Sequence, residues 1–492
     1  MTTRVLLAST LYGAATLAAA LDAGRLVPVD RNVLLVCNNA AVPETTPALD
    51  EMPGFGPLRD RFSAVVSWNA TIAPFHPGGW SPRADDIPLW ERYLRLDWDL
   101  GDDDVELVVE SLQVNPALAV TRIFTGAPVH VYADGLMSYG PTRDRIDPLV
   151  GTRVHRLLHL DLVPGLVPLL LTEYGVPPEI VPTDAFLKVL AELDDADGPG
   201  VLKALARPDG TGSTDGTGST DGTGGTDGTG GTDGTGGTDG PGQDPAAGPG
   251  PALLLGQYLS ALEILTPEEE EDLHLRMLRG TVALGHRRIV FKPHPTAPAD
   301  WSRGLAEEAE ALGARLTVLD TPVLAEVLYR RTRPALVVGC FSTALLTASA
   351  FHGLPVARVG TELLLERLAP YQNSNRVPVT LVDALLPCLD DQDAVRAQAM
   401  DRSPARIAEL NDLVTAVGYA MQPKLHPGRR ADAERYLSHH LDEVTRRYFK
   451  RRRLTALGLP GALPARFAFI PRSTAVRRVA RRARAVKRAT LG

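Results

Sequence analysis

The sequence is poor in cysteine and aromatic residues, and it contains no long apolar run. Its three cysteines, Cys37, Cys340 and Cys388, lie far apart and form no CxxC pair. This spacing excludes a disulfide-rich scaffold and a cysteine-ligated zinc site, and it favours a reducing, cytoplasmic compartment. No segment offers the ~20 consecutive apolar residues of a membrane-spanning helix. Aromatic residues make up only 5%, but a hydrophobic share of 44% in 492 residues can bury the cores of two or three domains.

Common cofactor and metal motifs are also missing. The chain has neither the GxGxxG of a dinucleotide-binding loop nor the GxxxxGK[ST] of a phosphate loop, which argues against those two cofactor classes. The acidic runs at 85–86 and 102–104 are typical of solvated loops or strand leads, and no DxD-like pair follows a predicted strand. We therefore expect chemistry that needs no metal and no bound cofactor.

A low-complexity segment, residues 207–250, divides the chain. Between Thr211 and Gly240 a hexapeptide is repeated five times, as TGSTDG twice and TGGTDG three times. Glycine, threonine and aspartate cannot build a core, so the composition predicts a disordered, mildly acidic linker.

The first 22 residues have two interpretations. The uncharged run that follows Arg4 contains an Ala-x-Ala and partly resembles a signal peptide. The sequence STLYG at residues 9–13 interrupts the run. A strand, a tight turn and an Ala-rich helix explain it better.

Short apolar strands alternate with helical stretches on both sides of the linker, which predicts two parallel α/β sheets, each covered on both faces. The expected strands are 5–8, 33–37, 64–67, 105–111, 129–132, 252–255, 288–291, 315–319, 335–338 and 355–359. The expected helices include one from about residue 14 and those at 116–124, 267–284, 304–312, 323–330 and 342–351. The predicted units are an N-terminal Rossmann-like domain (1–200), the linker (207–250), a C-terminal Rossmann-like domain (251–425) and a helical, basic tail (426–492).

Three short motifs follow predicted strands, at the edge where doubly wound sheets bind ligands. The first is Asp134-Gly135, in which the carboxylate can act as a general base, although Asp-Gly is also a common turn.

The second motif, VFKPHPT at residues 290–296, holds His294 between two prolines and places Lys292 before it. The imidazole can contact a phosphate or protonate a leaving group, and an ordinary loop is the alternative.

The third motif is Ser342-Thr343, which follows a strand ending at Gly339 and opens a helix. Hydroxyls and free N–H groups at a helix start can hold a phosphate, and simple helix capping is the alternative. A carboxylate in one domain and phosphate-binding groups in the other form a layout for attack on a sugar–phosphate bond.

At these residues the chain resembles the bacterial sialyltransferases, in particular actinobacterial members of the polysialyltransferase family. That family carries an acidic-acidic-Gly motif, a His-Pro motif and a Ser-Ser/Thr motif, in this order, on a GT-B fold. The corresponding residues here are Ala133-Asp134-Gly135, His294-Pro295 and Ser342-Thr343. The resemblance spans roughly residues 1–425 apart from the linker, although only the short motifs are specific.

The resemblance implies inverting, metal-independent transfer of sialic acid from CMP-sialic acid to a glycan, including elongation of a polysialic-acid-type polymer. Asp134 would be the base and His294 would help the nucleotide leave. The donor-binding residues would be Lys292, Gly339, Ser342, Thr343 and Asn375, the last within a polar run at 371–376. The alanine at 133 departs from the family pattern, so the base is Asp134 or Glu110, or activity has been lost.

Acceptor contacts are expected from loops that follow strands of the first domain. The candidates are Thr10, Tyr12, Asn38, Asn39 and Asn69, and turn formation is the alternative for the asparagines. Two other functions stay open: a GT-B enzyme that uses CMP-Kdo or a UDP-sugar, and an inactive homologue that binds an anionic glycan or a membrane.

The chain from Arg446 onward contains 13 Arg and 2 Lys and no acidic residue, whereas the preceding part has 36 basic and 59 acidic residues. This tail fits an anionic membrane or an anionic polymer, and a solvated tail is the alternative. No nucleic-acid motif accompanies the charge, so nucleic acid is not expected. We expect a cytoplasmic enzyme, peripheral at the inner face of the cell membrane.

Overall fold

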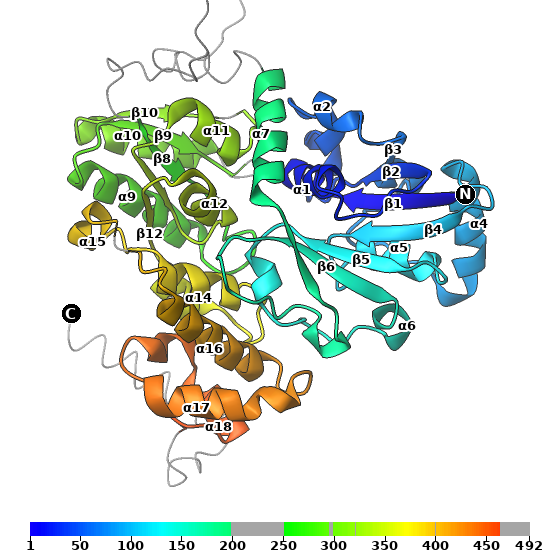
Figure 1. Cartoon of the computed structure of the whole chain (residues 1–492). Helices are drawn as coiled ribbons and strands as arrows, with labels where there is room; N and C mark the ends of the chain where they lie inside the picture. Colours follow the sequence, from blue (N-terminus) through cyan, green and yellow to red (C-terminus); the bar gives the residue numbers. More distant parts are fainter. Residues whose placement is uncertain (198–249, 295–298, 320, 399, 463–492) are drawn as a thin grey trace, which may run out of the picture.

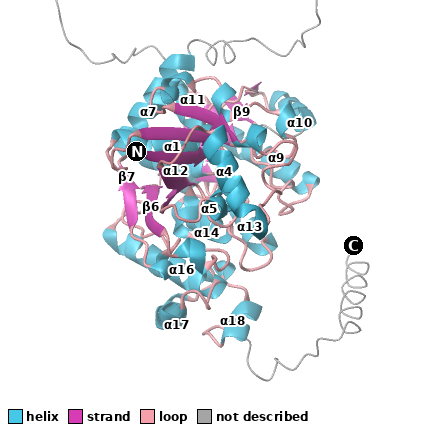
Figure 2. Ribbon diagram, turned by 90° about the vertical axis from the view of Figure 1, so that its right-hand side faces the viewer, coloured by secondary structure: helices cyan, strands magenta, loops and turns pink. Residues whose placement is uncertain are grey.

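The protein folds around two parallel β-sheets (Figure 1), as seen in a computed structural model that describes residues 1–197, 250–294, 299–319, 321–398 and 400–462. All strand pairs within the two sheets are parallel, and helices cover them (Figure 2). The predicted α/β class with two parallel-sheet domains is therefore confirmed. Apart from Gly250, the predicted linker lies outside the described residues.

The first sheet has seven strands in the order β3-β2-β1-β4-β5-β6-β7. Their bounds are β1 Thr2–Ala8, β2 Arg31–Val36, β3 Ala64–Ser67, β4 Asp104–Val109, β5 Val129–Ala133, β6 Val154–Leu160 and β7 Pro178–Val181. The sequence predicted the first five of these strands. It missed β6 and β7 because VHRLLHL and PEIV mix polar residues or proline into short segments, so neither shows a continuous apolar run.

The second sheet has five strands in the order β10-β9-β8-β11-β12, and all five were predicted. Their bounds are β8 Ala252–Leu255, β9 Arg288–Lys292, β10 Arg315–Val318, β11 Leu336–Gly339 and β12 Val356–Arg358. Every residue of the central strand β8 is buried, as expected for a strand with helices on both faces.

Helices connect the strands and cover both sheets. Their bounds are α1 Leu11–Asp22, α2 Gly56–Arg59, α3 Trp68–Thr71, α4 Ile87–Asp97, α5 Ala117–Ile123, α6 Pro148–Gly151, α7 Thr183–Asp197, α9 Pro267–Ala283, α10 Ala299–Ala311, α11 Ala325–Thr332, α12 Thr343–His352, α13 Thr361–Arg367, α14 Arg376–Leu385, α15 Gln392–Arg396, α16 Pro404–Met421, α17 Arg430–His440 and α18 Arg451–Leu457. Helix α1 begins earlier than predicted because Thr10 caps it, accepting a hydrogen bond from the Gly13 N–H at 2.9 Å.

Helix α7 stands between the two sheets and joins the domains (Figure 1). Its Phe186 ring lies 5.2 Å from Tyr12 of α1 and 6.1 Å from Phe351 of α12, measured between ring centroids. Near its end, Asp194 pairs with Arg331 of α11. Helix α16 returns to the first domain, where its Asn411 side chain accepts a hydrogen bond from the Val167 N–H. These contacts hold the two sheets in one arrangement.

Part of the predicted basic tail is folded against the second domain. The Tyr448 hydroxyl donates to Asp383 at 2.8 Å, and the same buried carboxylate accepts from the guanidinium of Arg358 at 3.0 Å. Residues 463–492 lie outside the described residues, and association of the tail with a membrane or polymer stays a prediction. Among the described helices, none has both the length and the apolar character needed to cross a bilayer.

Removing the Asp383 carboxylate should destabilise the second domain. The Asp383 side chain is fully buried, so Asp383→Ala leaves the 7%-exposed Arg358 side chain without its buried counter-charge. Breaking such a pair costs about 3–5 kcal/mol, so we expect Tm to fall by roughly 6 °C or more. The matched control Asp393→Ala removes a 98%-exposed carboxylate and should leave Tm nearly unchanged. Equal Tm values for the two variants in a thermal scan would contradict this account.

Candidate active site

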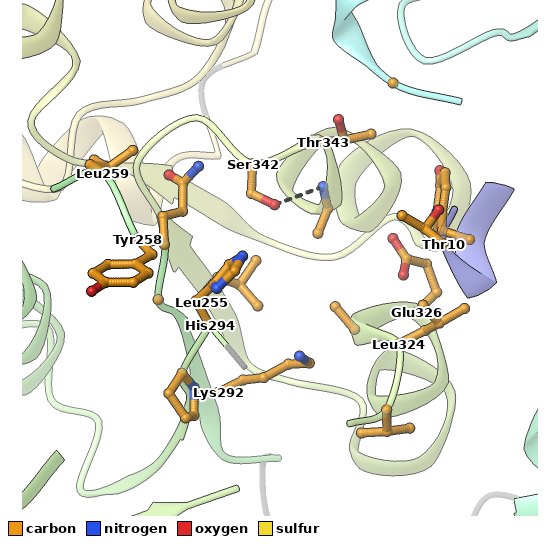
Figure 3. Close-up of a pocket in the computed structure, with 18 of the residues that line it drawn as sticks. Thr10, Leu255, Tyr258, Leu259, Lys292, His294, Leu324, Glu326, Ser342 and Thr343 are labelled. Atoms are coloured by element: carbon orange, nitrogen blue, oxygen red, sulfur yellow. Dashed lines mark hydrogen bonds between the residues drawn. The ribbon is translucent and has the colours of Figure 1, made fainter. Parts of the chain in front are cut away.

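A cavity of about 540 Å³ lies between the two domains, at the carboxyl ends of their strands. The first domain contributes Thr10, Tyr12, Asp134 and Gly135 to its wall. The second domain contributes residues that follow β8, β9 and β11 and the first turns of α11 and α12, drawn in Figure 3. The predicted motifs, distant in sequence, therefore meet at one cavity.

Asp134 follows β5 and lies on the cavity wall. Because side chains alternate along a strand, the preceding Ala133 packs into the core on the opposite side from Tyr132. Burial raises the pKa of Asp134, whereas its own backbone N–H and the Thr10 hydroxyl lower it. A carboxylate with a raised pKa is a better base for a sugar hydroxyl. Ala133 leaves no gap in the cavity wall, since its side chain belongs to the core.

Two glycines allow close approach around this carboxylate. A Cβ atom on Gly13, in the first turn of α1, would lie 2.8 Å from the Tyr132 hydroxyl and 3.3 Å from Asp134 Oδ2. A Cβ atom on Gly135 would lie 2.9 Å from the Thr343 hydroxyl of the second domain. A side chain at the glycine of the Asp-Gly motif would therefore force Thr343 of the opposite domain to shift.

Glu110 lies behind Asp134, after strand β4. Ser9 Oγ lies 2.6 and 2.7 Å from its two carboxylate oxygens, and the Tyr132 hydroxyl lies 3.4 Å from one of them. Burial raises the pKa of Glu110 to about 7, the bond from Ser9 opposes this, and the nearby Asp134 raises it further. Glu110 does not line the cavity. Of these two neighbouring carboxylates, only Asp134 is therefore exposed to a ligand in the cavity.

Lys292 and His294 lie on the second-domain wall at the end of β9 (Figure 3). Burial lowers the pKa of Lys292, and the Glu326 carboxylate partly offsets this. Burial and the neighbouring lysine lower the pKa of His294, whose ring centroid lies 6.2 Å from that of Tyr258. Pro295 lies outside the described residues, so the second half of the predicted His-Pro pair is not described.

Ser342 is the N-cap of α12, and its Oγ accepts a hydrogen bond from the Ala344 N–H at 3.2 Å. Since the hydroxyl oxygen is the acceptor in this bond, its hydrogen is available to a ligand in the cavity. The preceding loop is held by Gln257, whose side chain accepts from the Phe341 N–H at 3.0 Å. Thr343 has a second role, because its hydroxyl oxygen lies 3.5 Å from the Leu136 N–H of the first domain.

Glu326 and Gln257 are site residues that sequence reasoning missed. Glu326 opens α11, is 2% exposed and accepts a hydrogen bond from Thr347 at 2.7 Å. Burial raises the pKa of Glu326, opposed by the bond from Thr347. The strand-end rule could have found Gln257, which follows the correctly predicted β8, but α11 carries no local signal that directs Glu326 into a cavity.

Tyr12 is a predicted acceptor residue that lines the cavity together with Thr10. Its buried hydroxyl has no hydrogen-bond partner among the described residues. Burial raises its pKa, and the carboxylates of Glu326 and Asp134 raise it further. The hydroxyl is therefore a free polar group on the first-domain wall.

Several other predicted site residues do not line this cavity. Gly339 is buried at the end of β11, where an added Cβ atom would lie 3.4 Å from Leu345, so its role is close packing. Asn375 precedes α14, and its N–H donates to the Asn373 side chain. The two ends of the polar run 371–376 are buried, with the guanidinium of the fully buried Arg376 lying 4.2 Å from the Tyr371 ring centroid, and the residues between them are partly exposed.

The three predicted asparagines lie elsewhere on the first domain. Asn38 and Asn69 line a second cavity after β2 and β3, and their side chains bond to the backbone of the surrounding loops. Asn39 is exposed in the same loop. Within the described part of the chain, no group of three or more His, Cys, Asp or Glu side chains is arranged to hold a metal ion.

A family model described as Alpha-2,8-polysialyltransferase (POLYST) matches residues 4–361, well over half of the chain. The chain belongs to the alpha-2,8-polysialyltransferase family. The resemblance inferred from the three motifs is thereby confirmed, and this family member is a sialyltransferase-like glycosyltransferase. Its two Rossmann-like domains facing a cleft form the GT-B-like architecture that the resemblance implied.

No curated protein matches the sequence of this polysialyltransferase-family chain. Solved structures with a related arrangement include a sialyltransferase GT-B domain from Photobacterium damselae, with 10% identity, TM-score 0.40 and coverage of 78% of this chain and 96% of that one. MurG from Acinetobacter baumannii has 11% identity, TM-score 0.37 and coverage of 83% and 93%. UDP-GlcNAc 2-epimerase from Neisseria meningitidis has 10% identity, TM-score 0.42 and coverage of 85% and 99%. The family assignment rests on the family model alone.

The raised pKa of Glu110 predicts a pH-dependent stability. Because the folded protein binds the proton of Glu110 more tightly than the unfolded chain does, the free energy of unfolding is highest below the ordinary pKa of 4.5. The contribution of Glu110 to this free energy is lost as pH rises through about 7. The side chain of the Glu110→Gln variant stays neutral at every pH. We therefore expect the free energy of unfolding of the variant, relative to that of the wild type, to be about 1–3 kcal/mol higher at pH 8 than at about pH 5. Thermal unfolding at both pH values measures the gain. Glu307→Gln, at an exposed position on α10, is the control and should show no such difference.

Proposed function

We propose that this protein is an inverting sialyltransferase that transfers sialic acid from CMP-sialic acid to a hydroxyl group of a glycan acceptor. The observation that carries the proposal is one cavity with Asp134 on its first-domain wall and Lys292 and His294 on its second-domain wall. The first wall can accept a proton, and the second can bind an anion.

The second domain has the groups that a nucleotide phosphate requires. Lys292 and His294 supply positive charge or hydrogen-bond donors, and Ser342 presents a hydroxyl at the positive end of α12. Glu326 adds a carboxylate that can accept hydrogen bonds from sugar hydroxyl groups of the donor. The donor would therefore bind against the second domain, with its reactive carbon directed towards the first.

Transfer then needs one base and one stabilised leaving group. The acceptor oxygen forms a bond to the anomeric carbon of sialic acid while the bond from that carbon to the CMP phosphate oxygen breaks. Asp134 takes the acceptor proton, and the bonding electron pair leaves with the phosphate, where His294 and Lys292 stabilise the negative charge. Attack from the face opposite the phosphate inverts the configuration of the sugar.

We expect no metal and no bound cofactor to take part, because Lys292, His294 and the N-terminus of α12 can hold the donor phosphate without one. We also infer a cytoplasmic enzyme, peripheral at the inner membrane face. Free thiols at Cys37, Cys340 and Cys388 and the basic composition of residues 446–492 support this location.

A nucleotide panel tests the donor. We expect CMP and CMP-sialic acid to raise Tm by several degrees, with or without EDTA, and UDP, UDP-sugars and CMP-Kdo to have smaller effects. Slow release of CMP from CMP-sialic acid without acceptor should accompany binding. A shift with UDP-sugars alone would assign the protein to another glycosyltransferase reaction, and loss of the CMP effect in EDTA would contradict metal independence.

Variants of the two proposed catalytic residues should separate binding from chemistry. We expect Asp134→Asn to lower kcat about 10²–10⁴-fold while CMP still raises Tm, because the base does not face the nucleotide. His294→Ala should lower both kcat and the CMP-induced Tm shift. The controls are Asp144→Asn, at an 82%-exposed carboxylate, and His439→Ala, on the exposed face of α17. Near-normal turnover in either proposed catalytic variant would remove that residue from the mechanism.

A further inference from the structure

Glu270, in the first turn of α9, is a fully buried carboxylate that the proposed reaction does not use. Its Oε1 accepts a hydrogen bond from the Leu259 N–H at 2.6 Å, and its Oε2 accepts from the Ser260 N–H at 2.8 Å. The Ser260 hydroxyl donates to the same Oε2, also at 2.8 Å. Hydrogen bonds to a carboxylate are stronger than those between neutral groups, so these three bonds fix a short piece of chain firmly.

The piece of chain that Glu270 fixes belongs to the β8 loop, residues 256–262, which directly follows strand β8. Every residue of the β8 loop except Ser260 lines the main cavity on its second-domain side. The loop contains no helical or strand residue along its described length. The carboxylate of Glu270 therefore supplies the hydrogen bonds that regular secondary structure gives to backbone N–H groups elsewhere.

The start of the β8 loop is attached to the end of strand β9. The Gly256 N–H donates to the Lys292 carbonyl at 2.9 Å. A Cβ atom on Gly256 would lie 3.0 Å from the Phe291 ring and 3.2 Å from the Pro293 Cα, so the two segments are in close contact. A shift of the loop would therefore also shift the strand end that carries Lys292 and His294.

The ring of Tyr258 connects the β8 loop to the imidazole of His294, beside which it lies (Figure 3). The Tyr258 ring centroid lies 6.2 Å from that of His294 and 5.8 Å from that of Trp301 in α10. Aromatic rings attract each other at such separations. The Tyr258 ring therefore restricts the positions that the His294 imidazole can take.

The β8 loop also reaches the third motif. The Gln257 side chain accepts a hydrogen bond from the Phe341 N–H at 3.0 Å, and Phe341 directly precedes Ser342, the N-cap of α12. One loop thus contacts the chain at or next to each of the three groups assigned to the donor phosphate, which are Lys292, His294 and Ser342.

We propose that Glu270 is a positioning residue of the donor site, which fixes the β8 loop and thereby holds Lys292, His294 and Ser342 in the arrangement that one phosphate group requires. The inference rests on the proposed function, which assigns these three groups to the donor. Glu270 acts through the loop, because it is fully buried and does not line the cavity. Groups that are fixed before the ligand binds lose little conformational entropy on binding, and a small displacement of such groups is costly.

Replacing Glu270 with glutamine in the full-length chain tests the inference. The amide of Glu270→Gln has one acceptor oxygen, and its NH2 group faces one of the two backbone N–H groups, so at least one hydrogen bond is lost. We expect the Kd for CMP, measured by titration calorimetry well below Tm, to rise about tenfold or more. The KM for CMP-sialic acid should rise by a similar factor. The KM for the acceptor should stay unchanged, because the β8 loop belongs to the donor wall.

A loss of stability alone gives a different result. Partial unfolding lowers the number of binding sites and kcat, but it leaves the Kd of the folded molecules unchanged. Asp383→Ala, which removes another fully buried carboxylate of the second domain, should therefore lower Tm without changing the Kd for CMP. Glu268→Gln, at an exposed position in the first turn of α9, should change neither quantity.

Two milder variants extend the test. Glu270→Asp keeps the carboxylate but is one methylene shorter, so it reaches the loop less well, and we expect the Kd for CMP to rise at least about threefold. Ser260→Ala removes only the hydroxyl bond and should have a smaller effect than either Glu270 variant. An unchanged Kd for CMP in folded Glu270→Gln, or in Glu270→Asp where the glutamine variant does not fold, overturns the inference. An equal rise of Kd in Asp383→Ala also overturns it.

Failure of the proposed function gives a separate result. If the wild-type protein neither binds CMP nor hydrolyses CMP-sialic acid, the proposed function fails and this inference fails with it. If the wild-type protein binds CMP and both Glu270 variants bind it equally well, the proposed function stands and only the role of Glu270 is overturned.

Discussion

The burial of ionisable groups between the two sheets is the constraint on which the rest of the site depends. Burial is the largest influence on the pKa values of Asp134, Glu110, Lys292 and Glu326, and it disfavours the charged form of each. Keeping such groups away from water requires that both domains stay together, which the packing of Phe186 between α1 and α12 provides. The same burial strengthens every electrostatic contact with a bound donor.

Close contact between the domains also determines which small residues the motifs contain. Gly135 leaves room for the Thr343 hydroxyl, and Gly13 leaves room for Tyr132 and Asp134. Thr343, expected to hold phosphate, also touches the backbone of the opposite domain. The Asp-Gly and Ser-Thr motifs are therefore coupled, since each is part of the other's packing surface.

The two domains contribute different polar groups to the cavity between them. Lys292, His294 and the start of α12 place hydrogen-bond donors on the second-domain wall of the cavity. The first domain supplies carboxylates to both cavities and has a large negative net charge. The basic segment after Arg446 is partly folded onto the second domain, where Tyr448 bonds to Asp383.

The sequence by itself determined the α/β class, ten of the twelve strands in the described part of the chain and the three motifs at strand ends. The spacing of apolar residues and the choice of turn residues are local signals that can be read from the sequence. It also identified Asp134, Lys292, His294, Ser342 and Thr343, all of which meet at one cavity. It missed β6 and β7, whose polar residues hide the apolar run, and it missed Glu326, which faces the cavity only because of how α11 packs.

Only the tertiary structure decided which polar residues are available to a ligand. Asn38 and Asn69 come after strands β2 and β3 as Ser342 comes after β11, yet their amides are used to hold a loop. Asn375 and Gly339 serve local packing, and Tyr371 lies beneath Arg376 in the interior. Local sequence shows that a side chain can form hydrogen bonds. Whether the protein's own backbone already occupies it depends on residues distant in sequence, so only the folded chain can decide this.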